Sequence, residues 1–193
     1  MLCIATLLPA VSSAQSAILV FGDSLSAGYG IAREAAWPSL LQAELQRTHP
    51  HYKVVNASIS GETTSGGIQR LPATLKEHRP NIVIIELGAN DGLRGTRLDL
   101  MEKNLNGLIQ QSKKAGAKVL LLGMQLPPNY GVDYTKRFKT LYPKLAQRQR
   151  IELVPFMLQG IEPEQFQADN LHPVAEAQSK ILETVMQKLK PML

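Results

Sequence analysis

A serine near the start of the chain and a histidine near its end are the residues best suited to chemistry. Ser24 follows a short apolar run and closes the polar segment Gly22, Asp23, Ser24. His172 is one of four histidines, and Asp169 precedes it by three residues, a spacing at which one turn of chain can hold a carboxylate against an imidazole. A nucleophile, a base and an orienting carboxylate are the parts of a serine-based acyl transfer.

Simpler explanations exist for each of these residues taken alone. Asp23 and Ser24 resemble a helix cap, and Asp169 with His172 equally suits a capping aspartate beside a surface histidine. The other histidines, His49, His51 and His78, fall at predicted helix or strand ends and are interpreted as surface residues. The catalytic interpretation therefore depends on whether the fold brings Ser24 and His172 together.

Donors for a tetrahedral oxyanion are also present. The backbone N–H groups of Ser24 and Gly61 are candidates, because a glycine lets a substrate approach the main chain closely. Asn90 offers a neutral amide donor, although an Asn in such a glycine-rich turn often only stabilises its own backbone. This chemistry requires no metal and no cofactor.

The elements that must position these residues alternate along the chain. Apolar, strand-like runs are predicted at residues 18–21, 52–56, 81–87, 118–123 and 151–154. Helical patterns lie between and after them, at residues 35–48, 65–78, 98–115, 134–149, with an interruption near Pro143, and 173–189. Five strands alternating with helices indicate an α/β fold with a parallel sheet covered on both faces. The polar motifs then follow strand carboxyl ends, where open α/β sheets bind ligands.

Four short blocks resemble, in order, those of the SGNH (GDSL) hydrolases. They are GDSL at residues 22–25, the glycine of SISGET at 61, GAND at 88–91 and DNLHP at 169–173. Further segments, among them GDSLSAGYG, NDGLRG and LPPNYG, are similar to the bacterial periplasmic thioesterase, lysophospholipase and arylesterase branch. The resemblance covers nearly the whole chain after the first 16 residues.

This resemblance implies a flavodoxin-like three-layer α/β/α sandwich with a five-stranded parallel sheet. It implies Ser24 as nucleophile, His172 as base and Asp169 as its partner. It also implies an oxyanion hole formed by Ser24, Gly61 and Asn90. Ala89 stands where close relatives often have glycine, a change outside the positions to which roles are assigned.

Residues 1–16 are interpreted as a secretory leader that lacks a positively charged start, and residues 17–193 as a single hydrolase domain. The first charged residue is Asp23, and Ser12, Ser13 and Ala14 offer the small side chains of a signal-peptidase site. A disordered N-terminal tail is the alternative. Cys3 is the only cysteine, so the mature chain has no thiol nucleophile. We expect a periplasmic or secreted protein.

The chain carries a net charge of +5. Six basic residues without an acid lie within residues 136–150, which most often means a solvated helix face. Weak attraction to a membrane surface is the alternative. No nucleic-acid recognition pattern is present, and we expect a monomer that acts on a small-molecule ester or thioester.

The function predicted is that of a serine esterase acting on acyl esters and thioesters, including aryl esters, acyl-CoA and lysophospholipids. The acyl chain is expected to lie near Met124, Leu126, Pro127 and Tyr130, although ordinary loop packing explains those residues as simply. A carbohydrate O-acetyl esterase with the same residues is one alternative. A non-catalytic module that binds an anion at helix N-termini is the other.

Overall fold

The computed structural model describes residues 15–193 and contains one sheet of five parallel strands. The strands are β1 (Ser16–Gly22), β2 (Tyr52–Asn56), β3 (Ile82–Glu86), β4 (Lys118–Leu122) and β5 (Glu152–Val154). Their spatial order is β2-β1-β3-β4-β5. Most of the predicted leader, residues 1–14, lies outside the described residues, and Ser16 is already the first residue of β1.

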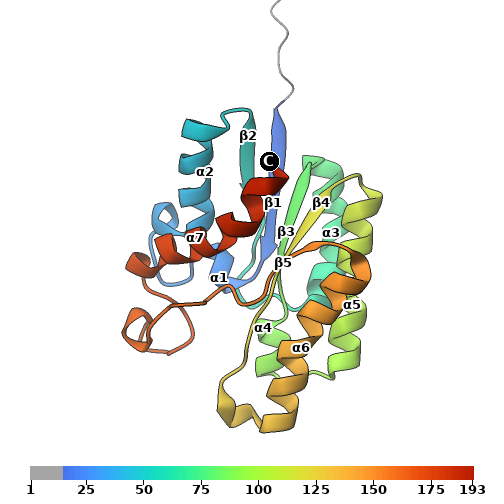
Figure 1. The fold of residues 1–193 in the computed structure, drawn as a ribbon, viewed down its shortest axis with the longest axis vertical. Helices are drawn as coiled ribbons and strands as arrows, with labels where there is room; N and C mark the ends of the chain where they lie inside the picture. The colour runs from blue at the N-terminus through green and yellow to red at the C-terminus, as the bar shows by residue number, and fades with distance from the viewer. Residues whose placement is uncertain (1–14) are drawn as a thin grey trace, which may run out of the picture.

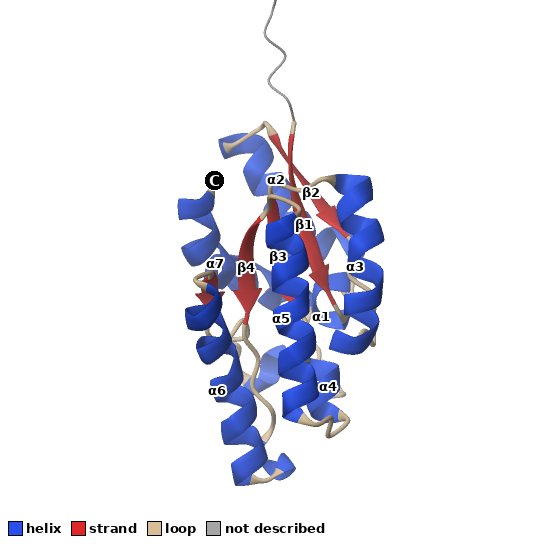
Figure 2. Cartoon of the chain, turned by 90° about the vertical axis from the view of Figure 1, so that its right-hand side faces the viewer, coloured by secondary structure: helices blue, strands red, loops and turns tan. Residues whose placement is uncertain are grey.

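Helices cover the sheet on both faces (Figures 1 and 2). On one face lie α2 (Trp37–Thr48) and α7 (Gln178–Leu189), which pack against each other. On the other face lie α3 (Thr64–His78), α5 (Leu98–Lys114) and α6 (Val132–Gln149). The predicted three-layer α/β/α sandwich is therefore confirmed. Two short helices, α1 (Ser24–Ala27) and α4 (Ala89–Leu93), follow strand ends directly.

The core forms on both faces of the three central strands. Ile18 to Phe21 of β1 and all five residues of β3 are buried, as are four of the five residues of β4. A strand that faces a helical layer on each side must be apolar on both, which is why these runs do not alternate with polar residues. Glu86, the last residue of β3, is the exception and is fully buried.

The strand order places a switch point between β1 and β3. The chain passes from β1 to β2 on one side of β1, and then crosses to β3 on the other side. Loops that leave the two strands at this point diverge and open a crevice at the carboxyl edge of the sheet. Ser24 follows β1 and Asn90 follows β3, so both residues lie at the switch point.

Two local features differ from prediction. The helix predicted at residues 35–48 begins two residues later, as α2 at Trp37, and Ala35 instead ends a short 3-10 turn, η1 (Arg33–Ala35). Helix α6 begins at Val132 and runs unbroken through Pro143, whose exposed position lets water replace the hydrogen bond that a proline removes. In the GAND segment, Gly88 is the N-cap of α4 and Asn90 lies within this helix.

Candidate active site

Ser24 is held at the start of α1 by the residues around it. Asp23 is the N-cap, and its Oδ1 accepts the N–H of Leu25 at 3.1 Å. Gly28 ends the helix after one turn in the left-handed conformation, with φ of 79°, which favours glycine. The strand, cap and stop together fix the serine at the carboxyl edge of β1.

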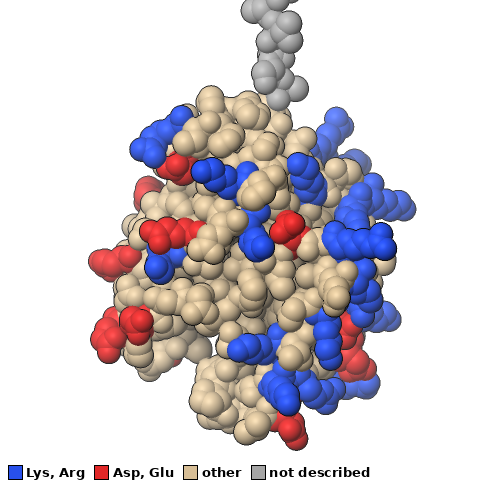
Figure 3. All heavy atoms as spheres, in the orientation of Figure 1, with Lys and Arg blue, Asp and Glu red and all other residues tan. Residues whose placement is uncertain are grey.

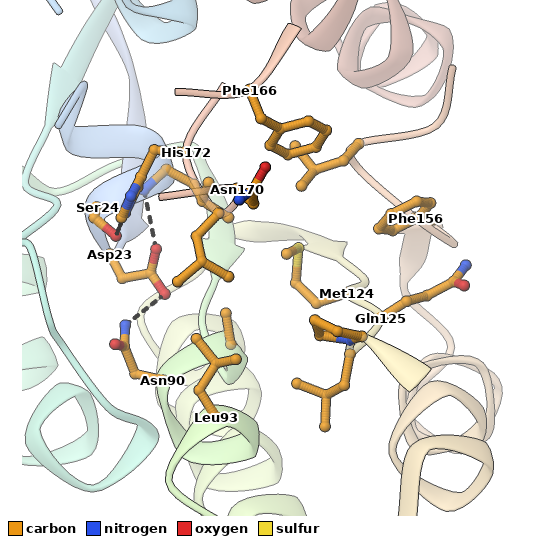
Figure 4. A pocket seen from close by; sticks show the side chains of 16 residues that line it. Asp23, Ser24, Asn90, Leu93, Met124, Gln125, Phe156, Phe166, Asn170 and His172 are labelled. Carbon is orange, nitrogen blue, oxygen red and sulfur yellow. Dashed lines mark hydrogen bonds between the residues drawn. The ribbon is translucent and has the colours of Figure 1, made fainter. Parts of the chain in front are cut away.

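Ser24, His172 and Asp169 form a continuous line of hydrogen bonds, of which Figure 4 shows the one between Ser24 and His172. Ser24 Oγ lies 2.8 Å from His172 Nε2, although 148 residues separate them in sequence. His172 Nδ1 lies 2.7 Å from Asp169 Oδ2, and Asp169 Oδ1 accepts the N–H groups of Leu171 and His172. The structure therefore brings together the three residues singled out from the sequence.

The carboxylate of Asp169 is ionised over the whole neutral range. Partial burial opposes its charge, but hydrogen bonds from the His172 side chain and from the backbone of His172 and Leu171 outweigh that effect and lower its pKa to about 2. A charged carboxylate only accepts hydrogen bonds, so the neutral imidazole carries its proton on Nδ1 and presents the lone pair of Nε2 to Ser24.

The loop that carries His172 is tied to the segment that carries Ser24. Phe166 pairs with Pro173 in an isolated antiparallel bridge that closes the loop. The Gln167 side chain donates to the carbonyl of Tyr29 at 2.8 Å, and the Gln167 backbone N–H donates to the carbonyl of His172. The Tyr29 ring lies against the imidazole, with centroids 4.6 Å apart. Neither Gln167 nor Tyr29 was singled out from the sequence, since an isolated Gln and an isolated Tyr give no signal.

The predicted oxyanion donors differ in how closely they approach the site. Asn90 lies in α4 with its Nδ2 donating to Asp23 Oδ2 at 3.0 Å, which leaves the second N–H of the amide available (Figure 4). Gly61 has φ of 79° in the turn before α3, and its carbonyl oxygen accepts a hydrogen bond from Arg94 Nη2 at 3.2 Å. Gly61 does not line the cavity described below, whereas Ser24 and Asn90 do.

Two buried carboxyl groups support this arrangement from below. Glu86 Oε2 accepts the backbone N–H of Asp23 at 3.1 Å and the hydroxyl of Ser26 at 2.7 Å. Burial, and then the neighbouring charge of Asp23, raise the pKa of Glu86 well above its usual range. Burial also raises the pKa of Asp23 to about 6, against the hydrogen bonds from Leu25 and Asn90. Glu86 therefore holds its proton more tightly than an exposed glutamate does, whereas Asp23 is mainly ionised at pH 7.

An apolar cavity of about 370 Å³ opens beside Ser24 (Figure 4). Its walls come from α4, from the loop after β4 and from the segment after β5. The apolar lining residues are Leu25, Ala89, Leu93, Met124, Leu126, Pro127, Phe156, Leu158, Phe166 and Leu171. Polar groups of Ser24, Asn90 and His172 lie at one end, as Figure 4 shows.

Of the four residues expected to contact an acyl chain, Met124, Leu126 and Pro127 line the cavity, and Tyr130 does not. Tyr130 closes the 3-10 turn η2 (Pro128–Tyr130), which carries it past the cavity wall. The opposite wall, with Phe156 and Phe166, was missed. The one indication of this wall in the sequence is the presence of large apolar residues, such as Phe156 and Phe166, in the irregular segment after the last strand.

A parallel α/β/α sandwich with a serine, histidine and aspartate joined at its carboxyl edge defines a serine hydrolase. Residues 20–180 match the model of the GDSL-like Lipase/Acylhydrolase family. The chain belongs to this family, which confirms the predicted resemblance, and it is an esterase of the SGNH type.

Named relatives extend over nearly the whole chain. The chain is 47% identical to "Esterase TesA" of Pseudomonas aeruginosa over 193 residues, which is 99% of this chain and 96% of that one. It is 42% identical to "Thioesterase 1/protease 1/lysophospholipase L1" of Escherichia coli K12, covering 94% and 87% of the two chains. A solved structure of TesA superposes with a TM-score of 0.90, 47% identity, and coverage of 92% and 100%.

Proposed function

We propose that the chain hydrolyses esters and thioesters of medium to long acyl chains through an acyl-enzyme on Ser24. The observation that carries this proposal is the hydrogen bond of 2.8 Å between Ser24 Oγ and His172 Nε2 at the polar end of an apolar cavity. A serine whose proton already faces a correctly oriented imidazole needs little further rearrangement to attack a carbonyl.

In the first half of the reaction, Ser24 Oγ attacks the acyl carbon while its proton moves to His172 Nε2. The ionised Asp169 stabilises the imidazolium that forms. The tetrahedral intermediate collapses as His172 gives the proton to the departing alcohol or thiol, which leaves an ester on Ser24. In the second half, His172 takes a proton from water, the hydroxide attacks the same carbon, and the proton returns to Ser24 as the acid departs.

The developing negative charge is assigned to three donors: the backbone N–H groups of Ser24 and Gly61, and the free N–H of Asn90. Asp23 holds the other N–H of Asn90 and so keeps the nitrogen of the amide, and not its oxygen, directed at the substrate. A reversed amide would place a carbonyl against the oxyanion and oppose the reaction.

The apolar cavity supports an acyl chain in preference to an acetyl group. An acetyl group would leave most of the 370 Å³ unfilled and would gain nothing from the phenylalanine wall at residues 156 and 166. The names of the similar proteins, which include thioesterase and lysophospholipase, point the same way. We therefore infer acyl thioesters and lysophospholipids as substrate classes, ahead of acetylated carbohydrates.

The test compares hydrolysis of nitrophenyl esters of graded chain length, acyl-CoA and lysophospholipid by wild type and Ser24→Ala. Ser179→Ala, at an exposed position of α7, is the matched control. We expect Ser24→Ala to lose turnover and fluorophosphonate labelling, with Ser179→Ala unchanged. Full activity of Ser24→Ala would refute the mechanism, and a preference for acetyl esters would refute the substrate class.

We also propose that the chain is exported and acts as a monomer in the periplasm or outside the cell, after loss of the leader. None of the helices within residues 15–193 is long and apolar enough to cross a membrane. Mass spectrometry of protein recovered from an exporting host tests the processing, with removal of the predicted leader, residues 1–16, expected. Size-exclusion chromatography with light scattering tests the monomer.

A further inference from the structure

Exposed apolar side chains gather at one end of the described molecule. Five large apolar residues are at least 40% exposed: Tyr29, Ile59, Leu100, Val132 and Leu171. Each lies on a loop that follows a strand or in the first turn of a helix that follows one. All five therefore lie at the carboxyl edge of the sheet, the edge at which the cavity opens.

Their placement differs from the usual scatter of single apolar residues on a protein surface. Leu171 lines the cavity, and the ring of Tyr29 lies against His172 at its polar end. Val132 follows the loop that contributes Leu126 to the opposite wall, and it is 79% exposed, so packing within the chain does not explain it. Leu171 and Tyr29 therefore lie at the site itself, and the other exposed apolar side chains lie at the same edge of the sheet.

The two sides of this end carry opposite charge. On one side, the first turns of α6 expose Lys136, Arg137 and Lys139, none of which forms an ion pair within the described residues. The acids near them are Asp133 of the same helix and two acids of α5: Asp99, which pairs with Arg97, and Glu102, which pairs with Arg148. On the other side, the segment after β5 exposes carboxylates at Glu162, Glu164 and Glu176. Figure 3 shows this division, with blue side chains over the α5 and α6 side and red ones on the opposite side.

We propose that this end of the molecule docks on an anionic lipid surface, tilted so that the α6 side meets the lipid. The docking face is formed by Tyr29, Ile59, Val132, Lys136, Arg137, Lys139 and Leu171. The apolar members enter the boundary between head groups and acyl chains, and the cations meet lipid phosphates. An acyl chain then passes into the cavity without crossing water. The entry of the acyl chain from the docked position into the cavity rests on the proposed function.

A fluid surface suits this face better than a folded partner does. The apolar side chains stand on separate loops around an opening and do not form one continuous groove for a helix or strand. The cations include two lysines, which attract phosphate as point charges without a fixed hydrogen-bond geometry. A lipid surface requires only apolar insertion and the right sign of charge, and both are present.

Vesicle sedimentation of the Ser24→Ala protein tests the docking without hydrolysis of the lipid. The probes are vesicles of phosphatidylcholine alone and vesicles that also contain phosphatidylglycerol. We expect binding to the anionic vesicles that weakens with salt. Reversing both lysines, Lys136→Glu with Lys139→Glu, should lower partitioning about 20-fold or more, since each cation near such a surface contributes about fivefold. Val132→Asp should lower it several-fold.

The matched control reverses two exposed lysines at the other end of the molecule, Lys76→Glu with Lys114→Glu, which lie in the last turns of α3 and α5. We expect this control to bind like the parent. Equal loss in both double variants would attribute binding to net charge alone and overturn the proposal. Equal binding to both kinds of vesicle, or displacement from vesicles by millimolar glycerophosphate, would overturn it as well.

Activity separates this proposal from the proposed function. In the protein that keeps Ser24, the α6 double variant should hydrolyse a soluble short-chain nitrophenyl ester normally and lose rate only on lysophospholipid held in anionic vesicles. An enzyme that hydrolyses no ester would refute the proposed function and leave the sedimentation result intact. Normal activity of the double variant on vesicles would refute the docking face and leave the proposed function intact. Circular dichroism confirms that each variant is folded.

Discussion

Asp23 offers the sharpest test of how this site is built, because it accepts a hydrogen bond from Asn90 and its buried charge lowers the free energy of unfolding by a measurable amount. It is 1% exposed, and its pKa is raised from 3.8 to about 6. At one pKa unit per 1.36 kcal/mol, keeping the ionised form buried costs about 3 kcal/mol. The charge nevertheless supplies acceptors for Leu25 N–H and Asn90 Nδ2.

The sign of the pH dependence follows from these values. The folded protein holds the Asp23 proton more tightly than the unfolded chain, so this group stabilises the fold at pH 4 and loses that contribution as the pH rises to about 6. Asp23→Asn has no such titration. The free energy of unfolding of Asp23→Asn, minus that of wild type, should therefore rise by about 2 kcal/mol between pH 4 and pH 7.

Activity should change in the opposite direction. An asparagine at position 23 can accept only one of the two hydrogen bonds with its oxygen, and its own N–H₂ then faces a donor. We expect kcat at pH 7 to fall about 10- to 100-fold with KM little changed, below the full loss of an oxyanion donor.

Urea unfolding across this pH range and steady-state hydrolysis of a soluble nitrophenyl ester provide the measurements. The contribution of Asp169, whose pKa is lowered, cancels in the difference between the two proteins. A stability difference that does not vary with pH would refute the assignment of a buried, ionised Asp23. An unchanged kcat would remove the hydrogen bond between Asp23 and Asn90 from the mechanism.

Four further substitutions test the surrounding parts. Asn90→Ala should lower kcat about 10²- to 10³-fold without altering the far-ultraviolet circular dichroism, and unchanged turnover would exclude it as an oxyanion donor. Gln167→Met should slow both fluorophosphonate labelling and kcat about tenfold, because it removes the hydrogen bond that ties the His172 loop to Tyr29. The control Gln165→Met, two residues away, should stay within twofold of wild type. Equal effects of the two substitutions would mean that the hydrogen bond to Tyr29 is unimportant. Met124→Trp should shift the preferred nitrophenyl ester to shorter chains by filling the cavity, and an unaltered chain-length profile would place the acyl chain elsewhere. Glu86→Gln should fold and retain activity, because burial and the neighbouring Asp23 favour the neutral form of Glu86. Glu86→Leu should lose about 2–6 kcal/mol in urea unfolding by leaving two buried donors unpaired, and a pronounced loss in Glu86→Gln would contradict the preference for the neutral form.

The alternation of apolar runs and helical patterns was sufficient to predict the α/β class and the five strands. The strand order could not be read from periodicity, because a strand buried on both faces is apolar throughout and carries no mark of its neighbour. The order β2-β1-β3-β4-β5 was therefore not predicted and comes from the structure. Prolines misled locally: Pro143 indicates a break in sequence, but its place on the outer face of α6 makes it tolerable.

The separation of residues along the chain determined which parts of the site could be predicted from the sequence. Asp169 and His172 are three residues apart, so their contact is local and their pairing could be predicted. The cavity wall at Phe156 and Phe166 depends on how an irregular segment folds back, which no period encodes. Tyr130 was placed at the wall because it neighbours Leu126 in sequence, yet the turn at residues 128–130 carries it away.

The hydrogen bonds of the polar cluster below Ser24 explain why two carboxyl groups, Glu86 and Asp23, are retained in an otherwise apolar layer. Glu86 cannot be replaced by an apolar residue without leaving the N–H of Asp23 and the hydroxyl of Ser26 unpaired, and both groups belong to the short segment that presents Ser24. Asp23 in turn links that segment to Asn90 on the neighbouring strand. In the proposed mechanism, one side of the switch point supplies the nucleophile Ser24, the other supplies the oxyanion donor Asn90, and the hydrogen bond between Asn90 and Asp23 joins the two sides. A neutral residue at position 23 would raise the stability of the fold at neutral pH, but it would remove the carboxylate that orients the amide of Asn90 in this mechanism.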